Sequence, residues 1–361
     1  MQKEGNAIVY CQGMFNTPNG KTAHGLVRFT RRYQVLSVVD AKYAGEDARQ
    51  VLDGRLGGIP VEASIEDAIA KAKNSSRPAT LLVVGLAPDG GRLGPAARED
   101  IKTALRFGLS VDYGLHDFLS EDPEMIAIAR EKNVVIRDVR KPPDRSSMHF
   151  FSGKIESVKA LKIAVLGTDS AVGKRTTAWL VVKGFERIGL RAALVGTGQT
   201  AWMQGADYCV IMDSLVNDFV SGEIEHAVWS AWDADRPDVI VMEGQGSLMN
   251  PAYPGGFELL AGGRPDVVVL QHAPARVEYD GFPGYPIQPL AHQIQAIEVL
   301  SSKPVVAVCV NHENLTNEKI PFMCEAITMA IGRPAFDVLR DGPADLVACL
   351  KSHLHIRERA A

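Results

Sequence analysis

The sequence lacks several features that mark specialised classes of protein. Its 361 residues include only five cysteines, scattered and without a CxxC pair, so neither a disulfide framework nor a zinc site is indicated. No apolar run approaches the roughly 18 residues of a membrane span, and the N-terminus lacks the apolar stretch of a secretion signal. The formal net charge of −4 provides no basic field for nucleic acid. We therefore expect a cytoplasmic protein with reduced cysteines that binds neither membranes nor nucleic acid.

The composition and length predict a globular protein of two domains. Hydrophobic residues make up 46% and charged residues 23%, and 361 residues exceed one ordinary core. Short β-branched runs alternate with amphipathic stretches, the pattern of parallel strands joined by crossover helices. The stretch 140–153 holds Pro142, Pro143, Ser146 and Ser147 without periodicity. We therefore expect an α/β fold with domains at 1–150 and 151–361.

The same alternation locates the expected elements. The strands of the first part are predicted at Ala7–Cys11, Gln34–Asp40, Thr80–Leu86, Leu109–Tyr113 and Asn133–Val139. Its helices are predicted at Glu46–Leu52, Ile65–Ala72, Pro95–Phe107 and Pro123–Lys132. The strands of the second part are predicted at Lys162–Leu166, Ala192–Val195, Tyr208–Met212, Val239–Met242, Val267–Gln271, Val305–Val310 and Ala335–Val338. Its helices are predicted at Arg175–Ile188, Ile224–Asp233, Ile287–Val299, Glu318–Ile331 and Ala344–Leu354.

A glycine loop follows the predicted buried strand that ends at Leu166. It reads Gly167-Thr168-Asp169-Ser170-Ala171-Val172-Gly173-Lys174-Arg175-Thr176-Thr177, and helix-forming residues come next. Glycine permits backbone angles that point successive N–H groups inward, and the start of a helix adds partial positive charge. Lys174 adds a full positive charge. This context predicts a P-loop that binds phosphate through Gly167–Thr177.

The loop departs from the usual P-loop in two ways. Five residues separate its glycines instead of four, and Arg175 stands where a Ser or Thr hydroxyl normally ligates Mg²⁺. The hydroxyls of Thr176 and Thr177 come one and two residues later. Because each residue along a helix turns the side chain by about 100°, we expect the usual Mg²⁺ ligand to be misplaced. The amino-acid sequence of this loop resembles that of the dethiobiotin synthetase branch of P-loop proteins. The segment 241–248 resembles a second motif of that branch, and its Glu243 is a candidate Mg²⁺ ligand or base.

Longer strings resemble one specific family over nearly the whole chain. The matches are Lys21–Leu26, Ala87–Gly91, Gly114–Leu119, Asp138–Pro143, Gly167–Thr177, Gly196–Thr200, Glu243–Gly246 and Gly281–Pro286. They resemble the D-glutamate N-acetyltransferase-like (DgcN-like) family, long catalogued as a domain of unknown function. The resemblance implies a Rossmann-like N-terminal domain, a P-loop C-terminal domain, and acetyl-CoA and an acidic amino acid as substrates.

Acetyl transfer to an amine needs a phosphate site for coenzyme A, a base, donors for an oxyanion and cations for the acceptor's carboxylates. The P-loop suits the phosphates of coenzyme A. The candidate bases are His272, His116, Glu243 and Asp169. The candidates for contact with the acceptor are Gly198, Gln199, Thr200, Arg276 and Lys21.

Two other functions stay open. One is an ATP-dependent kinase or ligase of the dethiobiotin synthetase type, which would use Mg-ATP. The other is a nucleotide-binding regulatory module without turnover. The base, the stereochemistry of the acceptor and the oligomeric state are undetermined, although homo-oligomers are common. Gly20-Lys21-Thr22 resembles the end of a second P-loop, but the turn-like residues before it and the expected lack of a following helix argue against one.

Overall fold

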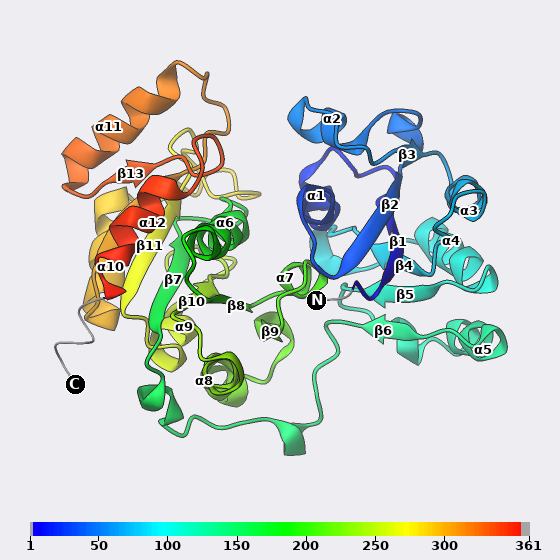
Figure 1. The fold of residues 1–361 in the computed structure, drawn as a ribbon, viewed down its shortest axis with the longest axis horizontal. Coiled ribbons are helices and arrows are strands. Elements are labelled where there is room, and N and C mark those ends of the chain that lie inside the picture. The colour runs from blue at the N-terminus through cyan, green and yellow to red at the C-terminus, as the bar shows by residue number, and fades with distance from the viewer. Residues whose placement is uncertain (1–2, 355–361) are drawn as a thin grey trace. The chain divides into compact units, whose positions relative to one another are not determined.

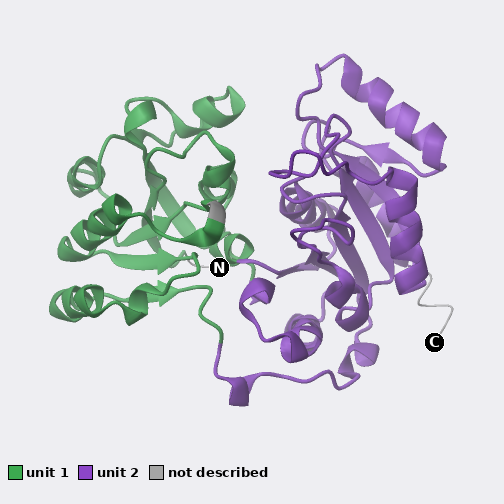
Figure 2. Cartoon of the chain, turned by 180° about the vertical axis from the view of Figure 1, so that it is seen from behind, with its two compact units in different colours: residues 1–142, 199–206 green, residues 143–198, 207–361 purple. Residues whose placement is uncertain are grey.

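The computed structural model describes residues 3–354 and divides into two compact units. The first contains the residues up to Pro142 together with Gln199–Ala206 (Figure 2). The second contains Pro143–Gly198 and the residues from Asp207 onward. The short segment 199–206 therefore leaves the second unit and returns to it.

The first unit is built on a parallel sheet of six strands in the order β3-β2-β1-β4-β5-β6 (Figure 1). This is the strand order of the Rossmann fold. Its strands are β1 (Gly5–Tyr10), β2 (Tyr33–Val39), β3 (Val61–Glu62), β4 (Leu81–Val84), β5 (Ser110–Tyr113) and β6 (Ile136–Asp138). Its helices are α1 (Lys21–Arg28), α2 (Ala48–Asp53), α3 (Ile65–Lys73), α4 (Pro95–Arg106), α5 (Pro123–Lys132) and α7 (Gln199–Met203).

Local sequence explains where these helices begin. Asp47, Ser64 and Asp122 accept backbone N–H groups at the starts of α2, α3 and α5, which satisfies donors that the helix leaves free. Pro95 and Pro123 occupy first helical positions, where the missing N–H costs nothing.

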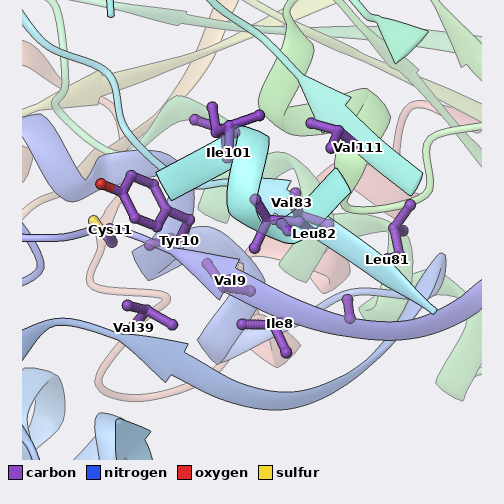
Figure 3. Close-up of a cluster of buried hydrophobic side chains, with 14 of the residues drawn as sticks. Ile8, Val9, Tyr10, Cys11, Val39, Leu81, Leu82, Val83, Ile101 and Val111 are labelled. Atoms are coloured by element: carbon purple, nitrogen blue, oxygen red, sulfur yellow. The ribbon is translucent and has the colours of Figure 1, made fainter. Parts of the chain in front are cut away.

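The core of the first unit lies along its central strands. Ile8, Val9 and Tyr10 of β1 pack with Leu82 and Val83 of the neighbouring β4, and all five are buried (Figure 3). Neither strand alternates between polar and apolar residues, because helices cover both faces of a parallel sheet.

The second unit is built on a parallel sheet of seven strands in the order β13-β12-β11-β7-β10-β8-β9. Its strands are β7 (Leu161–Gly167), β8 (Ala192–Gly196), β9 (Tyr208–Cys209), β10 (Val239–Glu243), β11 (Val267–His272), β12 (Val305–Val310) and β13 (Ala335–Phe336). Its helices are α6 (Lys174–Arg187), α8 (Asn217–Asp235), α9 (Phe257–Gly262), α10 (Leu290–Ser301), α11 (Lys319–Ile331) and α12 (Ala344–Lys351).

Two groups of helices cover this second sheet (Figure 1). Helix α6 packs on β7, β8 and β10, and it also contacts α12. Helix α9 packs against α8 and α10, and these helices share an apolar cluster with the sheet. The central strand β7 is buried along its whole length.

The expected α/β class is confirmed, but four short elements are missing from the sequence-based prediction. These are α1, α7, α9 and the two-residue strand β3. The expectation that no helix follows Gly20 was wrong, since α1 begins at Lys21.

The five cysteines are free thiols, and Cys11 and Cys309 are buried. None of the helices within residues 3–354 combines the length and apolar character that crossing a membrane requires.

Candidate phosphate-binding site

The predicted P-loop connects β7 directly to α6. The strand ends at Gly167, and the helix begins at Lys174. Gly173 has a φ of +105° and Ala171 a φ of +51°, so the chain passes through the left-handed region twice before the helix starts. A side chain disfavours this region, which explains the glycine at position 173. The turn and the start of α6 therefore have the geometry that directs backbone N–H groups at an anion.

Lys174 lies across the loop. Its Nζ donates to the carbonyl oxygens of Asp169 and Gly246, at 2.6 and 2.7 Å. A Cβ at Gly167 would lie 2.9 Å from Lys174 Nζ, so only glycine leaves room for the lysine there. A phosphate oxygen bound by Lys174 would have to compete with these carbonyl contacts.

Asp169 is fully buried, and donors surround its carboxylate. Oδ1 accepts from Ser170 N and Asn250 Nδ2, at 2.6 and 2.9 Å. Oδ2 accepts from Arg276 Nη1 at 3.0 Å and from Asp280 N at 2.9 Å. These four contacts favour a role in holding the loop. The prediction that Asp169 acts as a base remains untested.

Arg276 joins the phosphate loop to the segment after β12. Besides Asp169, its guanidinium donates to the Ser170 carbonyl at 2.8 Å and to both carboxylate oxygens of Glu313. Burial opposes the positive charge, but the hydrogen bonds of Glu313 and Asp169 and the negative charges of Glu313 and Asp280 outweigh it and raise the pKa of Arg276. These contacts favour a structural role for Arg276, and binding of a substrate carboxylate would have to displace one of them.

Glu243 and His272 end the two strands that flank β7. Strand β10 pairs with β7 on one side and β11 pairs with it on the other, all in parallel. The carboxyl ends of parallel strands form the edge where α/β sheets bind ligands. The sheet therefore places one predicted base on each side of the phosphate loop.

The carboxyl group of Glu243 is buried near positive charge. Burial raises its pKa, while Arg175, Thr197 N and Lys174 partly oppose the shift. Thr197 Oγ1 also donates to the Glu243 carbonyl at 2.9 Å, which ties the end of β10 to the loop after β8. Arg175, which replaces the usual hydroxyl, thus supplies a charge that acts on Glu243.

His272 contacts the first residue of the loop proper. Its Nδ1 and Thr168 Oγ1 lie 3.0 Å apart and share a hydrogen bond. Burial lowers the pKa of His272 to about 4, so the imidazole is neutral at pH 7. Thr177, a predicted ligand contact, donates its hydroxyl to Gln271 Oε1 of β11 at 2.5 Å.

The remaining predicted residues divide between the two units. Gly198 belongs to the second unit and packs against Gln245, since a Cβ there would lie 2.8 Å from Gln245 Nε2. Gln199, Thr200, Lys21 and His116 belong to the first unit.

Within the first unit these residues have varied surroundings. Thr200 is buried, and its Oγ1 lies 2.8 Å from Thr22 Oγ1. Gln199 is buried against Gly114. Lys21 is exposed at the start of α1. His116 is also exposed, with its ring against Gly91.

Sequence reasoning missed the side chains that fix the loop from a distance. Asn250 donates to Asp169, Glu313 binds Arg276, and Asn311 Nδ2 donates to the Val172 carbonyl at 3.0 Å. Asn311 and Glu313 follow β12 directly, and polar residues just after a parallel strand are the one local signal that points to them.

The fold and the loop define a two-domain α/β protein with a Rossmann-like domain followed by a P-loop domain. Comparison with known families agrees with this class. Residues 41–142 match the Rossmann-like domain described as DUF1611_N, and residues 149–347 match the P-loop domain described as DUF1611_C, both domains of unknown function. The chain belongs to the DUF1611 family.

Relatives of known name and structure support this membership. The chain is 30% identical over 278 residues to a D-glutamate N-acetyltransferase of Tritonibacter scottomollicae, covering 75% of this chain and 81% of the relative. A D-glutamate N-acetyltransferase of a Pseudoalteromonas species matches with the same identity and coverage. A crystal structure of a DUF1611 family protein from Anabaena variabilis ATCC 29413 superposes with a TM-score of 0.88 at 27% identity. It covers 97% of this chain and 100% of that chain.

Proposed function

We propose that this protein is an N-acetyltransferase that moves the acetyl group of acetyl-CoA to the amine of D-glutamate. The observation that carries the proposal is the 30% identity, over three quarters of the chain, to two enzymes of that name. The phosphate loop supplies a chemical basis, because coenzyme A carries a diphosphate and a 3′-phosphate. Backbone N–H groups, the α6 N-terminus and Lys174 are the donors that such a ligand requires.

The departure from the usual P-loop fits acetyl transfer better than phosphoryl transfer. Arg175 stands at the position of the usual Mg²⁺-binding hydroxyl, and the hydroxyl of Thr177 is engaged by Gln271. Phosphoryl transfer depends on Mg²⁺ to neutralise developing charge, whereas a loop that only grips coenzyme A does not.

The reaction removes two protons from the acceptor nitrogen and exchanges one bond at the carbonyl carbon. A base removes a proton from the ammonium group of the acceptor. The free amine then attacks the thioester carbonyl and a C–N bond forms. The C–S bond breaks as the thiolate of coenzyme A leaves, and the second proton lost by the nitrogen converts the thiolate to the thiol. We assign the base to His272, because it ends β11 beside the phosphate loop and its Nε2 makes no hydrogen bond to a residue within 3–354.

A thiol-release assay tests the proposal. Purified protein is mixed with acetyl-CoA and D-glutamate, and free coenzyme A is measured with a thiol reagent. We expect release that depends on both substrates, that falls sharply with L-glutamate, and that needs no Mg²⁺. ADP release from Mg-ATP without any thiol release would instead support a kinase or ligase. Binding without either product would support a regulatory module.

A further inference from the structure

An apolar groove opens beside the phosphate loop, at the end of β11. It has a volume of about 410 Å³ and lies between α10 and α11. Its walls include Pro274, Leu290, Met323, Ile327 and Ile331, and His272 provides its polar group. Ala326 and Ala330, one turn apart on α11, line it with small side chains that leave it open to solvent.

The groove and the phosphate loop are joined through Thr168. Its hydroxyl shares a hydrogen bond with His272, which lines the groove. Its carbonyl accepts from Gln293 Nε2 of α10 at 3.4 Å, so the α10 wall is tied to the same residue. Strands β7 and β11 are parallel neighbours that end at Gly167 and His272, so the phosphate loop and the groove lie at the same edge of the sheet.

The lining decides what kind of chemical group fits. Of the described residues that line the groove, none carries a charge at pH 7, because the imidazole of His272 is neutral there. A dicarboxylate acceptor would lose its hydration without gaining a cation, which is costly. An uncharged chain of alkyl and amide groups suits these walls, and 410 Å³ lies within the usual size of small-molecule sites.

We propose, on the basis of the proposed function, that this groove binds the acylated pantetheine arm of coenzyme A and brings its thioester to His272. The nucleotide phosphates stay at Gly167–Lys174, and the arm crosses the carboxyl ends of the neighbouring strands β7 and β11 to reach the groove. The acidic acceptor then approaches from outside the groove.

The test narrows the groove while leaving the phosphate loop intact. Ala330→Trp and, separately, Ala326→Trp place an indole in the groove from exposed positions of α11. Met329→Trp is the matched control, since Met329 is 79% exposed and does not line the groove. Each variant is titrated by calorimetry with coenzyme A and with 3′-phospho-ADP, which carries the same nucleotide without the arm.

We expect both groove variants to raise the Kd for coenzyme A by about tenfold or more. Their Kd for 3′-phospho-ADP and all values for the control should stay within about twofold of the wild type. An unchanged Kd for coenzyme A, or an equal loss for both ligands, would overturn the groove assignment and leave the proposed function standing. Failure of the wild-type protein to bind coenzyme A would overturn both.

Discussion

At the scale of single residues, the phosphate loop depends on one buried carboxylate. Asp169 accepts four hydrogen bonds from three separate segments of the chain, and Arg276 carries the connection onward to Glu313. A buried charge is tolerated only where it is paired and fully hydrogen-bonded. The side chain therefore stabilises the shape that the backbone N–H groups need.

Replacing Asp169 tests this structural role. Asp169→Ala removes the acceptor of four donors, although Arg276 remains paired with Glu313. We expect the free energy of unfolding to fall by about 3 kcal/mol. Urea denaturation measures the change. Asp233→Ala is the control, because Asp233 forms an exposed pair with Arg236, and its replacement should cost less than about 1 kcal/mol. Equal effects of the two substitutions would contradict the role assigned to Asp169.

His272 gives the protein a predictable response to acid. Its pKa is about 4 in the fold and roughly 6.5 in an unfolded chain, so the unfolded state binds more protons between these values. Its contribution to stability is therefore complete above pH 6.5 and is lost as the pH falls toward 4. Between pH 6.5 and 4, we expect the free energy of unfolding to fall less in His272→Asn than in the wild type. The difference should reach about 3 kcal/mol at pH 4, and denaturation at several pH values measures it. Parallel curves for the two proteins would refute the buried, neutral state of His272.

At the scale of elements, the strands and long helices were predictable because each carries its own repeating pattern. The missed helices α7 and α9 span only 5 and 6 residues, too short to show helical periodicity. Helix α1 contains Gly25 and follows a turn-rich segment, so its local signals favoured a loop.

The phosphate site was predictable only where it is continuous in sequence. Gly167, Lys174 and the strand before them form one local motif. The contacts of Asp169 with Arg276 and Asn250 depend on the order of strands in the sheet, which joins loops far apart in the chain. Periodicity within one segment does not encode that order.

The loop after β10 provides a prediction at this scale. Gly246 has a φ of +48°, its carbonyl accepts from Lys174, and a Cβ there would collide with the Tyr253 carbonyl. We expect Gly246→Ala to lower the free energy of unfolding by about 2 kcal/mol or more, since strain and collision add. Gly281→Ala is the control, because Gly281 has a φ of +80° but nothing within 4 Å of an added Cβ, so strain alone acts. Thermal or urea denaturation measures both variants. An equal loss in the free energy of unfolding for Gly246→Ala and Gly281→Ala would contradict the collision at Gly246.

At the scale of the whole molecule, the two units are not simply consecutive along the chain. Residues 199–206 belong to the first unit, and Met203 is fully buried in its core. A fragment that ends at about residue 150 therefore lacks the part of the first unit formed by residues 199–206.

A fragment comparison tests this. Residues 1–150 alone lack Met203, whose burial contributes about 1.5–3 kcal/mol. We expect this fragment to melt at a lower temperature than the same fragment fused through a Gly-Ser linker to residues 199–206. The control is the same fusion carrying Met203→Asp, and its melting temperature should be no higher than that of the plain fragment. Identical melting of the plain and fused fragments would contradict the assignment of this segment.

The most direct test of the central claim is a calorimetric titration of coenzyme A, without Mg²⁺, into the wild-type protein and Lys174→Ala. If the loop from Gly167 to Lys174 holds the ligand's phosphates, the substitution removes a charged hydrogen bond. The affinity should then fall by about 1–3 kcal/mol, or roughly five- to 150-fold in Kd. The same Kd in both proteins would contradict the claim.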